Sequence, residues 1–244
     1  MILDTTTDRL LVISDLHLGN PASTAEKRLL GFLDHAAEIG ASVCVNGDGF
    51  DVLQMSFTRL VSAGLPVLTR LRHVQAAGGT VHYVVGNHDI VLEHFLDNVL
   101  SFEMSPFLNV SSAGRRIRVE HGHVYDPFFA RYPRLYGGCT RAAGAALWLD
   151  KDLYRVWTYV SDALNGRRRR RAGDDALHYS YCHDAAEMLL ARGFDAVVFG
   201  HTHNAEVADL PSGTYLNAGN WLHGHTYVDI DHGDVSLQTW EPSV

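Results

Sequence analysis

Three short apolar runs, each followed at once by polar residues, constrain the fold of this chain more than any other feature of its sequence. The runs are Leu10–Ser14, Val43–Asn46 and Val81–Val85. Their length and their boundaries at turn-forming residues predict buried β-strands. Residues 23–39 and 57–77, which separate the runs, carry apolar side chains at helical spacing, with Pro66 as an irregularity in the second segment. This alternation of strand and helix predicts a sheet with parallel strands.

The rest of the sequence adds further predicted strands. Three are expected at Phe107–Val110, Arg116–Glu120 and Ala196–Phe199. Four more apolar segments with turn residues between them predict an antiparallel meander. These segments are Glu206–Leu210, Thr214–Asn217, Thr226–Ile230 and Val235–Trp240. The predicted fold is therefore of the α/β class, with two sheets packed together and helices outside them.

Five polar blocks hold side chains that bind metals, and most of these blocks directly follow a predicted strand. They read D-L-H (15–17), G-D-G-F-D (47–51), G-N-H-D (86–89), H-G-H (121–123) and G-H-T-H (200–203). Carboxylate, imidazole and amide oxygen together suit first-row divalent ions. On strand ends, such a set is typical of a two-metal hydrolytic site. The predicted ligands are Asp15, His17, Asp48, Asn87, His121, His201 and His203.

Two neighbouring divalent ions favour attack on phosphorus, because they lower the pKa of a shared water and neutralise the oxygens of a phosphoryl group. His88 follows Asn87 directly and is the predicted catalytic acid that protonates the leaving oxygen. Asp51 is expected to accept a hydrogen bond from His88 and to fix its tautomer. For His123 two interpretations stand side by side: a place near the metals or on the substrate phosphate, or a hydrogen bond within its loop.

The five blocks, in this order from about residue 11 to 203, resemble the motifs of the calcineurin-like metallophosphoesterase family. The resemblance implies a four-layer α/β/β/α sandwich of two mixed sheets and a dinuclear metal centre. It assigns His88 as the catalytic histidine and Asp51 as its acidic partner. It assigns one ion to Asp15, His17, Asp48 and His203. It assigns the other ion to Asp48, Asn87, His121 and His201.

Within this family the chain is most similar to UDP-2,3-diacylglucosamine hydrolases, in its size and in a helical insertion before the G-H-T-H block. The resemblance implies cleavage of a pyrophosphate during lipid A assembly, with the insertion as a lid over acyl chains. The best-known branch of that group carries arginine where this chain has His88. This chain keeps the G-N-H-D block of the wider family.

Residues 124–195 differ in composition from the rest of the chain, since they hold more than half of its basic residues and half of its aromatic residues. We predict that they form a helical insertion, or lid, between two segments of the core, residues 1–123 and 196–244. The aromatic side chains either form the core of this insertion or line a substrate pocket. The arginine run 167–171 is either a solvated loop or a patch that holds a diphosphate or an anionic headgroup. The expected substrate contacts are His123, Tyr125, Trp148, Arg167 and Arg168.

Composition limits the partners and the compartment. The formal net charge of −8 argues against nucleic acid as a partner of the whole surface. Three widely spaced cysteines predict a reducing compartment without disulfides. The N-terminal residues predict no signal peptide, and no apolar run has the length of a transmembrane helix. We expect a cytoplasmic protein, with peripheral contact to the inner membrane through the insertion as an open alternative; the oligomeric state is not predicted.

The sequence thus predicts a metal-dependent phosphoesterase that hydrolyses a phosphodiester or pyrophosphate bond with two divalent ions. Manganese is the expected metal, and iron, cobalt or zinc suits the same donors. UDP-2,3-diacylglucosamine or a similar nucleotide-linked lipid is the expected substrate. One alternative is a nucleotide phosphodiesterase or a phosphomonoesterase with another substrate. The other is a non-catalytic metal-binding scaffold or a membrane-associated module.

Overall fold

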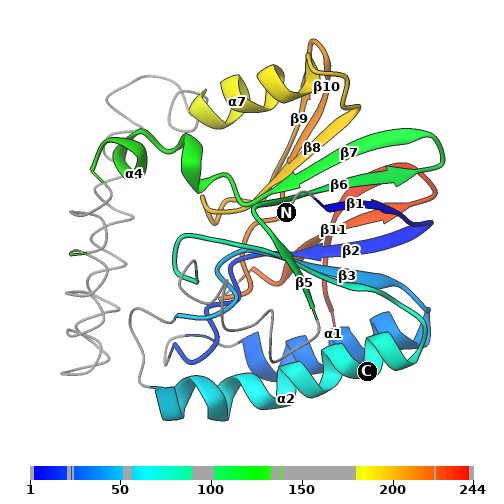
Figure 1. Ribbon diagram of the computed structural model, residues 1–244, viewed down its shortest axis with the longest axis vertical. Coiled ribbons are helices and arrows are strands. Elements are labelled where there is room, and N and C mark those ends of the chain that lie inside the picture. The colour runs from blue at the N-terminus through cyan, green and yellow to red at the C-terminus, as the bar shows by residue number, and fades with distance from the viewer. Residues whose placement is uncertain are drawn as a thin grey trace.

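The computed structural model of the chain describes residues 3–20, 23, 25–51, 57–89, 102–132, 138, 180–222 and 224–241. Two six-stranded mixed sheets pack face to face, with helices on the outer face of each (Figure 1). The helices α1 (Ala25–Glu38) and α2 (Phe57–Ala76) cover the first sheet, and α7 (Ser180–Leu190) covers the second. The predicted α/β class and the four-layer sandwich are confirmed.

The first sheet has the strand order β12-β11-β2-β3-β4-β5. Its parallel strands are β2 (Arg9–Ile13), β3 (Ser42–Asn46), β4 (Val81–Val84) and β5 (Glu103–Ser105). The hairpin of β11 (Thr226–Asp231) and β12 (Asp234–Thr239) extends the sheet antiparallel to β2. The three apolar runs near the N-terminus therefore lie side by side as predicted, while the three-residue strand β5 was not predicted.

The second sheet has the strand order β1-β6-β7-β8-β10-β9. Its central strands β7, β8 and β10 are parallel, whereas β6 pairs antiparallel with β7 and β9 pairs antiparallel with β10. The short strand β1 was not predicted; it pairs with the edge of β6. The strands are β1 (Leu3–Thr6), β6 (Phe107–Ser112), β7 (Arg115–Glu120), β8 (Ala196–Phe199), β9 (Glu206–Leu210) and β10 (Gly213–Asn217).

The predicted meander of the four C-terminal strands is wrong. The β9–β10 hairpin belongs to the second sheet, and the β11–β12 hairpin belongs to the first. Turn residues specify a hairpin locally, but the sheet that a hairpin joins depends on which strand presents an open edge. Here β10 pairs with β8, and β11 pairs with β2.

Apolar cores at the three layer boundaries hold the sandwich together. Leu11 and Ile13 of β2 belong to the core beneath α1 and α2, while Leu10 and Val12 belong to the core between the sheets. Successive side chains of a strand point to opposite faces, so the apolar stretch Leu10–Ile13 of β2 is buried on both sides. The third core lies between α7 and the second sheet and includes Phe199. These contacts fix how the two sheets lie against each other.

The predicted limits of the helical insertion, residues 124–195, stay a prediction. In this range the structure describes the short helix α4 (Pro127–Arg131), and also α7, whose apolar face packs on β8 and β10. Trp148 and the arginine run with Arg167 and Arg168, which belong to this predicted insertion, lie outside the described residues. Among the helices that are described, none has the length and apolar character needed to cross a bilayer.

The carboxyl ends of parallel strands from both sheets meet at one edge of the sandwich. In the first sheet β2, β3 and β4 end there, and in the second sheet β7 and β8 end there. Each of the five sequence blocks begins one or two residues after the end of one of these strands. In open α/β sheets ligands bind outside this edge, so the fold brings all five blocks to one place.

Candidate metal centre

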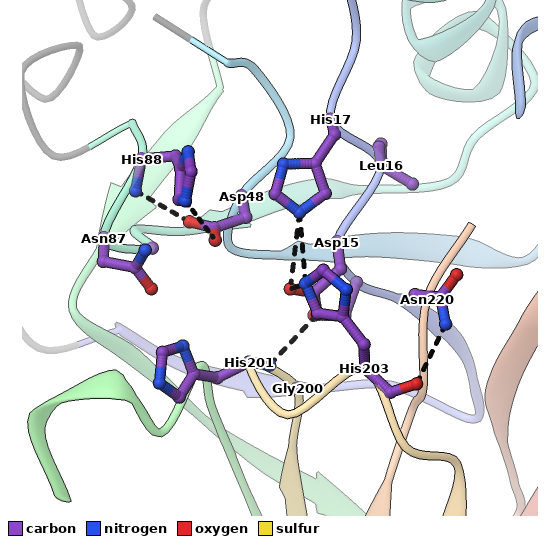
Figure 2. A network of polar contacts seen from close by, with 12 residues as sticks. Asp15, Leu16, His17, Asp48, Asn87, His88, Gly200, His201, His203 and Asn220 are labelled. Carbon is purple, nitrogen blue, oxygen red and sulfur yellow. Dashed lines mark hydrogen bonds and ion pairs between the residues drawn. The ribbon is translucent and has the colours of Figure 1, made fainter. Parts of the chain in front are cut away.

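The ligand-type atoms of the five blocks converge at this edge (Figure 2). In each of three groups, the atoms lie within 4.8 Å of one another. The groups are Asp15, His17 and His203; Asp15, Asp48 and His121; and His17, Asp48 and His88. Asp15 and Asp48 each belong to two groups, so they connect the side chains of the two sheets.

The backbone at the site is left-handed at five predicted ligands. Their φ angles are 55° at Asp15, 45° at His17, 51° at Asp48, 65° at His201 and 59° at His203. Residues with a side chain rarely adopt this conformation, which costs about 1–3 kcal/mol each and concentrates at functional sites. Backbone hydrogen bonds hold the loops in place: the Asp15 N–H donates to the Gly47 carbonyl at 3.1 Å, and the His17 N–H to the Asp48 carbonyl at 2.9 Å.

Three motif glycines leave space for the site. A Cβ on Gly86 would lie 2.3 Å from both the backbone nitrogen and Oδ1 of Asp48. A Cβ on Gly47 would lie 2.4 Å from His121 Nδ1, and a Cβ on Gly200 would lie 2.8 Å from Asp15 Oδ2. Since real Cβ atoms do not approach so closely, these positions require glycine for the side chains to converge.

Asp15 is fully buried, and one of its two oxygens is held by the protein. Its Oδ2 accepts hydrogen bonds from Ser14 Oγ at 2.5 Å and from the His201 backbone N–H at 3.0 Å. Its Oδ1 faces ring nitrogens, with His203 Nε2 at 3.1 Å and His17 Nε2 at 3.9 Å. The two ring nitrogens lie 3.2 Å apart, so three donor atoms surround a single point.

Asp48 lies between this group and the side chains that follow β4 and β7. Its Oδ1 accepts the backbone N–H of His88 at 2.8 Å. Its Oδ2 lies 3.5 Å from His121 Nε2 and 3.9 Å from His88 Nε2. The Oδ1 of Asn87 in turn lies 3.2 Å from His121 Nε2. This central position is the one required of a carboxylate that bridges two ions.

Hydrogen bonds from the far side of two rings determine which nitrogen faces the site. His121 Nδ1 lies 2.8 Å from the carbonyl of Asn46, and His17 Nδ1 lies 2.7 Å from Asp51 Oδ1. An imidazole that donates Nδ1–H to such an acceptor presents the lone pair of Nε2 on its other side. Both Nε2 atoms point toward Asp15 and Asp48.

His201 contacts the site in a different way. Its backbone N–H donates to Asp15, and its ring lies beside that of His121 with centroids 5.4 Å apart. Its Nε2 lies 3.1 Å from Oδ2 of Asp126, the residue that precedes α4. Because Nε2 of His201 contacts a carboxylate, Nδ1 is the ring nitrogen that remains to bind a metal ion.

Asp51 contacts His88, as the sequence predicts, and contacts His17 as well. Its Oδ1 lies 3.0 Å from His88 Nδ1 and 2.7 Å from His17 Nδ1. Its Oδ2 accepts a hydrogen bond from Asn20 Nδ2 at 2.8 Å. One carboxylate therefore orients both a predicted metal ligand and the predicted catalytic histidine.

The buried charges balance one another across the site. Burial alone would lower the pKa of His17, but the carboxylates of Asp51, Asp48 and Asp15 raise it to about 10. In the same way, carboxylates raise the pKa of His121 to about 9 against the effect of burial. Burial would raise the pKa of Asp48, yet the neighbouring imidazoles hold it well below its usual range. The site thus holds ionised carboxylates that attract cations.

The remaining described candidates lie beside this group. His123 is buried next to His121 and against Phe129 of α4, with ring centroids 5.4 Å and 5.0 Å away. Burial and the neighbouring histidines lower its pKa to about 3, so the ring is neutral at pH 7. Tyr125 stacks on Phe199 and its hydroxyl donates to Glu120 at 3.5 Å. Whether either residue contacts a substrate stays a prediction.

The residues present fit divalent ions. Carboxylate oxygens, an amide oxygen and imidazole nitrogens converge, and first-row divalent metals accept these donors once the imidazoles have lost the proton on the ligating nitrogen. Unpaired burial of several carboxylates is costly, and a divalent cation offsets that cost by replacing the protons of the ligating histidines.

The sequence prediction missed several supporting residues. Ser14 and Asn46 are the last apolar-run positions before their blocks, and Asn20 lies just beyond D-L-H-L-G. Asp89 accepts hydrogen bonds from the N–H groups of Gly49 and Gly86, which joins two loops. Asp126 had a local sequence signal, because Asp before Pro is typical of a helix N-cap. That signal predicts the start of a helix and not the contact with His201.

Comparison with known proteins identifies the class of this protein. The family model described as calcineurin-like phosphoesterase matches residues 8–205. The chain belongs to this family and is a metal-dependent phosphoesterase. The UDP-2,3-diacylglucosamine hydrolase of Porphyromonas gingivalis is 24% identical to this chain, in an alignment that covers 93% of this chain and 96% of the hydrolase. The enzyme of the same name from Nitrosococcus oceani is 34% identical over 80% of this chain and 78% of its own length.

Solved structures share the fold. A dimetal phosphatase from Danio rerio has a TM-score of 0.51 at 11% identity, covering 94% of this chain and 95% of that chain. An archaeal phosphodiesterase has a TM-score of 0.50 at 14% identity, covering 95% of this chain and 99% of that chain. These likenesses establish the architecture of two packed sheets with outer helices.

Gly86→Ala tests the space that the site requires. The added methyl group would collide with Asp48, and we expect a loss of stability of about 1–3 kcal/mol together with weaker Mn²⁺ binding. Gly31→Ala is the matched control, because a Cβ there meets no atom within 4 Å and alanine favours the helix. Urea unfolding and Mn²⁺ titration measure both effects. Equal Mn²⁺ affinity in the two variants would contradict the steric argument.

Divalent metal should stabilise the folded chain. A ligand that binds only the folded state at 100 times its Kd adds about 2.7 kcal/mol, so Mn²⁺ is expected to raise the Tm of metal-free protein by several degrees. Asp48→Asn should remove most of this shift. Differential scanning calorimetry measures it, and an unchanged shift in Asp48→Asn would exclude the central position assigned to this carboxylate.

Proposed function

We propose that this chain hydrolyses a phosphodiester or pyrophosphate bond at a dinuclear metal centre, and that its substrate is UDP-2,3-diacylglucosamine or a similar nucleotide-linked lipid. The observation that carries the reaction type is the convergence of carboxylates and imidazoles from both sheets around Asp15 and Asp48. The names of the relatives, with near full-length coverage, support the substrate.

In this proposal the ions are held by the seven residues predicted from the sequence. Asp48 is the shared ligand, since its two groups include side chains of both sheets. When bound, two divalent ions lower the pKa of a shared water and neutralise the non-bridging oxygens of the phosphoryl group. Manganese is the proposed metal, and iron, cobalt and zinc suit the same donors. The ligands are Asp15, His17, Asp48, Asn87, His121, His201 and His203.

His88 is proposed to donate a proton to the leaving oxygen. Its Nδ1 faces Asp51 at 3.0 Å, and its Nε2 lies 3.9 Å from Asp48 Oδ2, at the border of the ligand group. The Asp51 carboxylate behind Nδ1 keeps a proton on Nδ1, and the carboxylates of Asp48 and Asp51 raise the pKa of His88 against the effect of burial. They thereby favour the imidazolium form, in which Nε2 carries a proton that it can donate. The ring is largely buried, with 12% of its side chain exposed, so it is shielded from bulk water but accessible to a substrate.

The insertion is the proposed source of substrate selectivity. Residues 124–195 hold half of the aromatic residues of the chain and most of its basic residues. Aromatic side chains suit acyl chains or a base, and arginines suit a diphosphate. The proposed substrate contacts are His123, Tyr125, Trp148, Arg167 and Arg168. The proposal also places the protein in the cytoplasm, with this segment in peripheral contact with the inner membrane.

A substrate panel tests the proposal. Protein loaded with Mn²⁺ is incubated with UDP-2,3-diacylglucosamine, an aryl phosphodiester and an aryl phosphomonoester, and products are identified by mass spectrometry. Release of UMP and lipid phosphate supports the proposal. Turnover confined to the aryl phosphodiester or monoester would replace the lipid substrate with a nucleotide or monoester substrate. Failure of every phosphoester with Mn²⁺, Fe²⁺, Co²⁺ and Zn²⁺ would refute the hydrolytic function.

Two variants should separate catalysis from metal binding. His88→Ala is expected to retain both ions and to lower kcat by about 10²–10⁴-fold, the usual contribution of a general acid. Asp51→Ala should lower kcat and also weaken Mn²⁺ binding, because Asp51 orients His17 as well as His88. Steady-state kinetics and Mn²⁺ titration provide the two readouts. Full turnover in His88→Ala would remove this histidine from the mechanism.

A further inference from the structure

Asp126 is a carboxylate outside the five motif blocks that touches one of the proposed ligands. Its Oδ2 lies 3.1 Å from His201 Nε2. Its Oδ1 accepts backbone N–H groups of the first turn of α4, from Phe128 at 2.8 Å and from Phe129 at 3.3 Å. The two oxygens of one side chain thus have separate partners, a helix on one side and an imidazole on the other.

The backbone around Asp126 restricts its side chain. Asp126 is the N-cap of α4, with Pro127 next in the helix, and its own N–H donates to the His123 carbonyl at 3.2 Å. A carboxylate that caps a helix through one oxygen has little freedom to move the other. The position of α4 therefore sets the position of the oxygen that faces His201. In Figure 1, α4 lies at the edge of the sandwich where the strands end.

The ring of His201 lies beside the rings of His121 and His123, and its Nε2 faces Asp126. The tautomers of His17 and His121 are fixed by Asp51 and by the Asn46 carbonyl. Asp126 is the corresponding hydrogen-bond acceptor for the ring of His201, but it contacts Nε2, whereas the acceptors of His17 and His121 contact Nδ1. A carboxylate beside Nε2 keeps the proton on Nε2 and leaves the lone pair on Nδ1.

We propose that Asp126 is a positioning residue for His201, which fixes the tautomer and orientation of this ligand and connects the affinity for one of the two ions to the placement of α4. The inference rests on the proposed metal-binding role of His201. Since α4 is the first described helix of the predicted insertion, the contact joins the segment proposed to select the substrate to the metal centre. By linkage, any ligand that displaces α4 changes metal affinity, and bound metal in turn favours one placement of α4.

Two substitutions distinguish positioning from helix capping. Asp126→Ser keeps an N-cap oxygen but has no second oxygen for His201. Asp126→Asn also keeps the cap, yet it places an N–H donor against Nε2 and favours the tautomer whose Nδ1 cannot bind metal. If Asp126 only caps α4, both variants bind metal as the wild type does. If it positions His201, both bind one ion about 10–100-fold more weakly, with Asp126→Asn at least as weak as Asp126→Ser.

Mn²⁺ titration of metal-free full-length protein, followed by electron paramagnetic resonance of free Mn²⁺, gives the affinity and number of ions without any substrate. Glu206→Gln is the matched control, because Glu206 makes a similar contact of 2.9 Å with His183, which is not a proposed ligand. That variant should bind both ions as the wild type does. Thermal unfolding of each metal-free variant verifies that it is folded.

A double-mutant cycle with His201→Ala tests whether Asp126 acts through His201. We expect Asp126→Ser to have no further effect on Mn²⁺ affinity in the His201→Ala background. An equal loss in both backgrounds would overturn the proposal, and so would unchanged affinity in both Asp126 variants. If the wild type itself bound no Mn²⁺, Co²⁺ or Zn²⁺, the proposed function would fail, which is a separate outcome from the failure of Asp126 alone.

Discussion

The buried carboxylates Asp15, Asp48 and Asp51 impose the constraint on which the rest of this structure depends. Charges removed from water are costly unless opposite charges lie close to them. The compensating imidazoles come from both sheets, with His17 and His88 on one and His121 on the other. The sheets must therefore pack with the carboxyl ends of their parallel strands at one edge, which the apolar core between them ensures.

The loops at that edge adopt backbone conformations that are locally unfavourable, and these conformations bring the ligand side chains together. Left-handed conformations at Asp15, Asp48 and His203 are unfavourable for residues with side chains. Hydrogen bonds between loops, such as those of Asp89 with Gly49 and Gly86, hold these conformations in place. The glycines of the motifs are explained by the close approach of neighbouring side chains, not only by turn geometry.

Orientation of the imidazoles forms a second level of organisation. Asp51 and the Asn46 carbonyl contact Nδ1 of His17 and His121, so that Nε2 of each ring faces the carboxylates of the site. Asp126 contacts Nε2 of His201 and leaves Nδ1 as the nitrogen proposed to bind metal. Two of these acceptors belong to the core sheets or their loops, whereas Asp126 begins α4. This difference makes the His201 side of the centre the place where the insertion and the metal chemistry meet in the proposed function.

The sequence by itself determined the α/β class, three of the four parallel strands of the first sheet and the residue blocks that follow them. Apolar periodicity and strand-end motifs are local signals. It did not determine which sheet the C-terminal hairpins join, since edge availability is a property of the assembled fold. It also did not reveal that Asp51 contacts His17 in addition to His88, or that Asp126 reaches His201 across 75 positions of the chain. Such contacts depend on the packing of two sheets and a helix, and only the tertiary structure decides them.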